Sequence, residues 1–391
     1  MKKKSFIKSL QPKDRYMVCN LYFLYFIQGI FVLLLGSILP MMREEYGFSY
    51  DVSGYLISAH NIGNVIMGFF AGIMTLRFGM KRSLTIFNIV IYIGWGITLV
   101  TGNPVLLIIA ILMTGLGRGI VSNYNNQVIS DLSQGSATPL NILHACFAVG
   151  AVLAPVLTLL CSKQGNHGWR YTVYVLIAFG ILSIISNLFM DMSSVTPEKT
   201  EGGSTSLGFL KDRLFLKTMG IMFFYLCVEA SVMGWMVTYY TDSGVFSENT
   251  TQILTSVLWI TILVGRFSCS ILGKHMLPSS IIRILSLGIL VFLMLLVGSH
   301  SAIPMLIATI GLGLSMSGMY GTTVANAGTV FAEYPMAMSV FVLITAMGSV
   351  FTPTIIGNIS NASNIRTGMA VLIIPAIVLN VLAFINRKHK K

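Results

Sequence analysis

Apolar residues fill the chain in blocks of roughly twenty, the length an α-helix needs to cross the hydrocarbon core of a bilayer. Short polar segments separate the blocks, and this alternation indicates repeated crossings. The expected fold is an all-α integral membrane protein, because helices satisfy their own backbone hydrogen bonds in lipid. The pattern predicts twelve transmembrane helices, at residues 16–40, 53–76, 83–102, 105–130, 139–161, 170–190, 215–240, 250–273, 278–298, 303–329, 335–358 and 366–386.

The longest polar stretch runs from Asp191 to Lys217 and divides six predicted spans from six. Its Ser, Thr, Gly, Pro and charged residues are typical of a flexible linker. We therefore expect an N-terminal six-helix bundle at 1–190, a cytoplasmic linker at 191–214 and a C-terminal six-helix bundle at 215–391. Six plus six spans suggests two pseudo-symmetric halves related by an axis along the membrane normal.

Composition supports a membrane protein, since 55% of the residues are hydrophobic and only 10% are charged. The net charge of +12 does not require a nucleic-acid partner. Of the 25 Lys and Arg residues, 19 lie in or beside segments assigned to the cytoplasm. Four lie in segments assigned to the extracellular side, and Arg118 and Arg266 lie within spans. This asymmetry places both termini in the cytoplasm. We expect a monomeric, multi-pass protein of the cell membrane that contacts lipids and binds no metal or cofactor.

Away from the ends of the predicted spans, three formal charges remain, namely Arg118, Glu229 and Arg266. At ~1.5 Å per residue, Glu229 lies ~20 Å and Arg118 ~18 Å from the cytoplasmic face, and Arg266 ~10 Å from it. A charge at such a depth costs at least ~2.5–3.5 kcal/mol, so it needs a partner, a proton or a water-filled cavity. The central question is why so apolar a chain keeps Glu229.

The loop after the second span, Gly72 to Arg82, resembles the signature of the major facilitator superfamily, Gly-x-x-x-Asp-Arg-x-Gly-Arg-Lys/Arg. Leu76 stands where the superfamily has an acidic residue. The resemblance implies the major facilitator fold and a transporter that works by alternating access. It also implies a cytoplasmic gate, although Leu76 removes its acidic part. The residues expected to serve gating are Gly72, Arg77, Gly79, Lys81, Arg82 and Arg266.

Further stretches are similar to the fucose/glucose/galactose permease branch, which consists largely of proton-coupled sugar symporters. They are Gly115 to Gly117 with Asn126, Leu140 to Pro155 with Asn141 and His144, Glu229 to Tyr239, and Trp259 to Arg266. Sugars need amide partners and an aromatic platform. The residues expected to bind substrate are Gln28, Arg118, Asn125, Asn126, Asn141, His144, Glu229, Trp235, Trp259 and Asn326.

The chain departs from that branch in its acidic residues. The branch carries its proton on carboxylates in spans 1 and 4, where this sequence offers Gln28 and Ser122. Coupling has therefore either moved to Glu229 or been lost. In the superfamily arrangement Glu229 and Arg118 face each other across a central cavity. A permanent Glu229–Arg266 pair that only fixes helix packing is the alternative.

The expected function is secondary transport of a small polar solute, a sugar or sugar-like molecule, with protons taken up by Glu229. The alternative is a carrier or exporter of an organic anion or amphipathic compound that uses Arg118. A membrane sensor is disfavoured because no soluble domain is predicted, and no hydrolytic or redox constellation suggests an enzyme.

Overall fold

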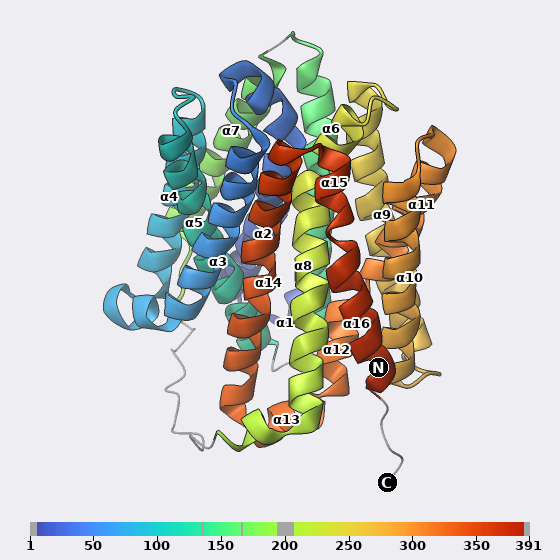
Figure 1. Cartoon of the computed structure of the whole chain (residues 1–391). Coiled ribbons are helices and arrows are strands. Elements are labelled where there is room, and N and C mark those ends of the chain that lie inside the picture. Colours follow the sequence, from blue (N-terminus) through green and yellow to red (C-terminus); the bar gives the residue numbers. More distant parts are fainter. Residues whose placement is uncertain (1–5, 134–136, 166, 194–206, 387–391) are drawn as a thin grey trace. The chain divides into compact units, whose positions relative to one another are not determined.

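The computed structural model describes residues 6–133, 137–165, 167–193 and 207–386, and these form helices joined by short connections (Figure 1). No β-strand occurs among them, which confirms the predicted all-α fold. The described residues divide into two compact units. Most of the predicted linker, at 194–206, lies outside the described residues, and the predicted domain limits stay a prediction.

The first unit contains residues 1–48 and 59–199, and the second contains 49–58 and 200–391, so the continuous helix α3 begins in the second unit and ends in the first. Helices α1 to α7 are α1 (Phe6–Ser9), α2 (Pro12–Tyr46), α3 (Tyr50–Phe78), α4 (Met80–Thr98), α5 (Pro104–Leu132), α6 (Ala137–Ser162) and α7 (Gly168–Phe189). The remaining elements are η1 (Gly208–Lys211), α8 (Arg213–Asp242), α9 (Glu248–Leu272), α10 (Pro278–Gly298), α11 (Ala302–Met316), α12 (Met319–Asn326), α13 (Gly328–Glu333), α14 (Pro335–Ala362), α15 (Ile365–Ala370) and α16 (Ile373–Ile385).

Within the described ranges, eleven helical stretches are long and apolar enough to cross a membrane. The remaining predicted span corresponds to α4, which begins with Met80, Lys81 and Arg82. Because α4 has only 19 residues, any membrane-length window includes those two cations, and they lower its mean hydropathy.

Local sequence explains where the helices begin and end. The side chain of Asn103 accepts hydrogen bonds from the first backbone amides of α5, and Pro104 follows as the first helical residue. Asp212 caps α8 in the same way. Gly47 ends α2 with φ 69°, and Gly79 separates α3 from α4 with φ 76°, a left-handed conformation that favours glycine.

Several helices begin or end a few residues from the predicted bounds, and the span predicted at 366–386 divides into α15 and α16. Helix α2 continues through Pro40 to Tyr46, and proline is tolerated inside membrane helices. The predicted continuous span 303–329 is interrupted after Met316, and α12 resumes at Met319. Ser317 and Gly318 form this break within one apolar stretch.

Helices α2 and α6 approach each other through glycine. A Cβ built on Gly29 would lie 2.0 Å from the carbonyl oxygen of Phe147, and one on Gly150 would lie 2.0 Å from that of Phe26. Backbone therefore rests directly on backbone at this contact, as is common where small residues line membrane helix interfaces.

We expect Gly150→Ala to destabilise the protein by ~1–3 kcal/mol or more, because the added methyl group overlaps the backbone of α2. Gly96→Ala in α4 is the matched control, since a Cβ there meets nothing within 4 Å. The measurement is the thermal unfolding midpoint in detergent. Equal midpoints for the two variants would show that α2 and α6 do not need this contact.

Candidate functional site

The first unit places a cluster of amide and hydroxyl groups between α2 and α5. Gln28 is buried and donates from Nε2 to Ser122 Oγ at 2.6 Å. Its Oε1 atom is buried and accepts no hydrogen bond from the described residues. One turn along α5, Asn126 donates to the Tyr25 hydroxyl at 3.0 Å and to the Ser122 carbonyl at 2.8 Å. Asn125, fully buried, donates to the carbonyl of Leu21 at 3.3 Å.

An aromatic face adjoins this cluster. The Tyr25 ring meets the His144 imidazole edge-on, with ring centroids 5.5 Å apart. His144 and Asn141 both have exposed side chains on α6. The structure thus brings Gln28, Asn126 and His144 to a common region around Tyr25, and it keeps Asn125 inside the α2–α5 packing.

His60 on α3 is a buried ionisable residue that the sequence reasoning missed. Its Nδ1 atom lies 2.9 Å from Thr114 Oγ1, and Thr114 donates its own proton to the Ile111 carbonyl at 2.6 Å. Thr114 can therefore only accept from His60, so Nδ1 carries the hydrogen and Nε2 is a buried acceptor. Arg118 lies one turn beyond Thr114 and acts electrostatically on His60.

The second unit holds Glu229, half-buried on α8. Its Oε1 atom lies 2.8 Å from the hydroxyl of Tyr225, one turn earlier on the same helix. The same hydroxyl lies 2.8 Å from the carbonyl oxygen of Met316, the last residue of α11. Arg266 on α9 acts electrostatically on Tyr225. Arg118 belongs to the first unit and Glu229 to the second, so their predicted pairing stays a prediction.

Asn326 ends the short helix α12, which packs between α8 and α10. The side chain is 1% exposed, and neither its amide nitrogen nor its oxygen has a hydrogen-bond partner among the described residues. Thr323, one turn earlier, also has a buried hydroxyl without such a partner. A buried amide normally satisfies both groups, so α12 has hydrogen-bonding capacity that the fold leaves unused.

The two tryptophans proposed as platforms are buried. Trp235 is fully buried, donates from Nε1 to the carbonyl of Pro353 at 3.3 Å, and lies beside Tyr50 with ring centroids 6.3 Å apart. Trp259 on α9 is 4% exposed. The indole of Trp235 thus fills the α8–α14 packing within the second unit, and the substrate role of both residues stays a prediction.

In the predicted gating loop, Gly79 makes the turn between α3 and α4, and Lys81 bonds the end of α7. Lys81 Nζ donates to the carbonyl of Leu188 in the last turn of α7 at 3.0 Å, which places a cation at a helix C-terminus. Arg77 and Arg82 are exposed, and Leu76 is 82% exposed at the position where the superfamily signature is acidic. No residue of this loop is shown to gate, so its role stays a prediction.

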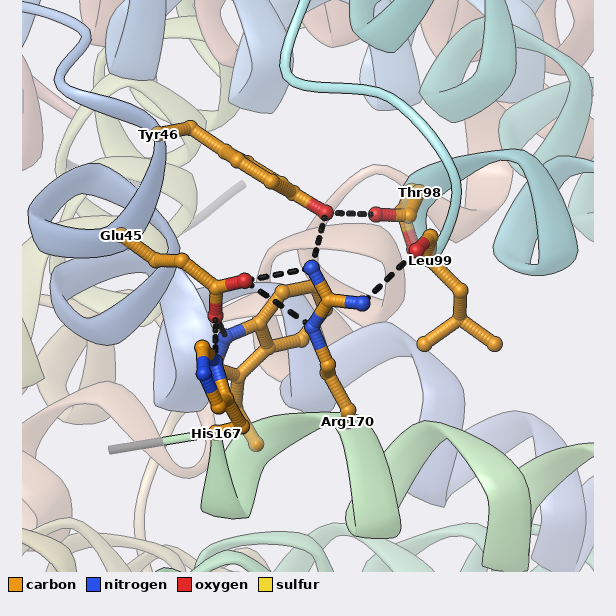
Figure 2. A network of polar contacts seen from close by, with 7 residues as sticks. Glu45, Tyr46, Thr98, Leu99, His167 and Arg170 are labelled. Atoms are coloured by element: carbon orange, nitrogen blue, oxygen red, sulfur yellow. Dashed lines mark hydrogen bonds and ion pairs between the residues drawn. The ribbon is translucent and has the colours of Figure 1, made fainter. Parts of the chain in front are cut away.

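A network of charged and polar side chains joins the end of α2 to the start of α7 (Figure 2). The carboxylate of Glu45 receives Trp169 Nε1 at 2.6 Å and His167 Nδ1 at 3.0 Å, and it also binds the Arg170 guanidinium. Arg170 in turn donates to the Leu99 carbonyl and to the hydroxyl of Tyr46. Sequence reasoning missed this network because Glu45 lies more than a hundred residues from Trp169 and Arg170.

Comparison with known proteins places the fold. A sequence model described as Major Facilitator Superfamily matches residues 21–333. The glucose/mannose transporter GlcP of Bacillus subtilis (strain 168) is 21% identical over 369 residues, covering 92% of this chain and 91% of GlcP. The solved nucleoside transporter NupG aligns with a TM-score of 0.74 at 14% identity, covering 97% of this chain and 100% of NupG. The E. coli fucose:proton symporter FucP aligns with a TM-score of 0.64 at 17% identity, covering 95% of this chain and 99% of FucP.

We expect Glu45→Gln to destabilise the protein by ~1.5–3 kcal/mol, because hydrogen bonds to a charged acceptor lose their charge assistance. Glu44→Gln removes a neighbouring exposed carboxylate and is the matched control. Thermal unfolding in detergent measures both. A Glu45→Gln midpoint no lower than that of Glu44→Gln contradicts a stabilising role for the network.

Proposed function

The chain belongs to the Major Facilitator Superfamily, and we propose that it carries a sugar or sugar-like molecule across the membrane by alternating access. Its similarity to a glucose/mannose transporter over nearly the whole of both chains supports a hydroxyl-rich solute. So does its resemblance in fold to a fucose:proton symporter. The superfamily and these relatives are transporters rather than enzymes.

The observation that carries this proposal is the unused hydrogen-bonding capacity of buried amides. Gln28 offers a buried acceptor in the first unit, and Asn326 offers both a donor and an acceptor in the second. An amide presents a donor and an acceptor side by side, which matches neighbouring hydroxyl groups on a sugar ring. Tyr25 and His144 supply apolar ring faces beside the Gln28 cluster.

Glu229 is proposed as the group that takes up the coupling proton. It is the acidic residue placed deep in a predicted span, and intramembrane carboxylates mark proton relays. Its hydrogen bond to Tyr225 shows that the fold holds a proton-sharing partner at bonding distance. We further propose that the protein works as a monomer in the cell membrane, among lipids, with both termini in the cytoplasm.

We expect neutral hexoses to raise the thermal unfolding midpoint of the purified protein, because a ligand that binds only the folded state stabilises it. Gln28→Leu should weaken that binding roughly tenfold, since it removes the amide and keeps the volume. Asn88→Leu is the control, because the Asn88 amide is used within the fold by donating to Ser183. Stabilisation by organic acids but by no sugar supports the alternative, an organic-anion carrier that uses Arg118.

We expect Glu229→Gln to abolish proton-driven solute accumulation in proteoliposomes and to spare counterflow exchange. The amide cannot release a proton, whereas exchange needs only binding and reorientation of the carrier. Glu333→Gln, an exposed carboxylate on α13, should leave both activities unchanged. Full accumulation by Glu229→Gln would assign Glu229 a structural role.

A further inference from the structure

The hydroxyl of Tyr225 has two acceptors within reach and one proton to give. Its oxygen lies 2.8 Å from Glu229 Oε1 and 2.8 Å from the Met316 carbonyl oxygen. A phenol donates a single hydrogen bond. Two full two-centre hydrogen bonds therefore form only when the carboxyl group of Glu229 supplies a proton of its own; otherwise the acceptors compete for one proton.

Two arrangements follow from the protonation state of Glu229. When Glu229 is a carboxylate, it takes the phenolic proton as the stronger acceptor, and the Met316 carbonyl loses its donor. When Glu229 is protonated on Oε1, it donates to the phenolic oxygen, and Tyr225 turns its proton to Met316. The proton on Glu229 thus decides whether the end of α11 is hydrogen-bonded to α8.

Met316 is the last residue of α11 and lies directly before the break in the helix. Its carbonyl is one of the last four of α11, which lack a regular donor inside their helix. The break at Ser317 and Gly318 follows directly. This break is tightly packed against α9, because a Cβ on Gly318 would lie 2.4 Å from the sulfur of Cys269. Beyond it, α12 carries Thr323 and Asn326, whose buried polar groups are unused.

We propose that Tyr225 transmits the protonation state of Glu229 to the break between α11 and α12. The inference rests on the proposed role of Glu229 as the proton-binding residue. Protonation of Glu229 strengthens the hydrogen bond from Tyr225 to the Met316 carbonyl and so restrains the break at Ser317 and Gly318. Deprotonation of Glu229 weakens that bond and removes the restraint. Tyr225 is then a positioning residue that links the proton to the helix bearing Asn326.

Other charged and titratable groups lie on the elements that pack against α8. Helices α12, α14 and α16 pack against α8 and contain no charged residue. Arg266 on α9 carries a fixed positive charge and cannot exchange a proton at neutral pH. The other titratable side chains on elements that pack against α8 are Lys211, Glu248, Cys269, Tyr320 and Arg366.

The test is amide hydrogen exchange of residues 317–326 in the purified full-length protein, measured at acidic and alkaline pH and corrected for the chemical exchange rate. In the wild type we expect exchange at the break to be slower at acidic pH by about two- to tenfold, the effect of one hydrogen bond. Glu229→Gln should hold the slow value at both pH values, because its amide donates to Tyr225. Tyr225→Phe should hold the fast value at both.

Tyr239→Phe is the matched control. Tyr239 lies on the same helix, is fully buried, and donates to the Leu296 carbonyl at 2.9 Å, so the variant also loses a phenol-to-carbonyl bond. It should keep the pH dependence of the wild type. A pH-dependent Tyr225→Phe, a pH-independent Tyr239→Phe, or a wild type without pH dependence would each overturn the inference.

The exchange experiment needs no solute, so its outcome is separate from the proposed function. A protein that transports no sugar can still show the proton-dependent break. Conversely, sugar accumulation that depends on Glu229, with no change at residues 317–326, leaves the transport proposal intact and rejects the role of Tyr225.

Discussion

A polar atom inside a bilayer cannot be paired with water, so the protein itself must supply its partner. Many of the described residues meet this constraint within their own or a neighbouring helix. Helices satisfy the backbone, and hydroxyls such as that of Thr158 bond back to a carbonyl one turn earlier. Tyr239 bonds a neighbouring helix in the same way. Asn326 departs from this constraint furthest, because among the described residues it is the one buried amide whose nitrogen and oxygen both have no partner, and for this reason it directs attention to a ligand.

The same constraint separates two kinds of acidic residue. Glu45 lies at the end of α2, and three side chains converge on its carboxylate, so its charge is fixed in one arrangement (Figure 2). Glu229 shares the phenolic proton of Tyr225 with a backbone carbonyl, so the position of that proton depends on whether Glu229 is charged. The first arrangement suits an anchor between helices, and the second suits a group that gains and loses a proton.

Much of the fold could be predicted from the sequence because hydropathy is a local property. It located the membrane helices and singled out Glu229 as a charge in an apolar run. Hydropathy could not locate the break after Met316, because Ser317 and Gly318 do not interrupt an apolar pattern and the break depends on packing against α9. Tyr225 stands four residues before Glu229, and that spacing could have indicated their contact on one helix face.

Other parts of the site depended on contacts distant in sequence. His60 was detectable as an ionisable residue in an apolar span, but its hydrogen bond to Thr114 comes from a separate helix. The Glu45 network joins residues whose neighbours in sequence give no hint of one another. The burial of Trp235 against Pro353 likewise needed the three-dimensional packing, since an aromatic residue in a span fits a core as well as a binding site.

The glycine contact between α2 and α6 has a mechanical consequence. Where backbone touches backbone, no side chain remains that could change rotamer to alter the spacing of the two helices. The pair is stiff at the Gly29 and Gly150 contacts and should move as one solid piece in any cycle. The α11–α12 stretch differs in that its helix is interrupted at Ser317 and Gly318, so a change of direction there does not need to bend a continuous helix.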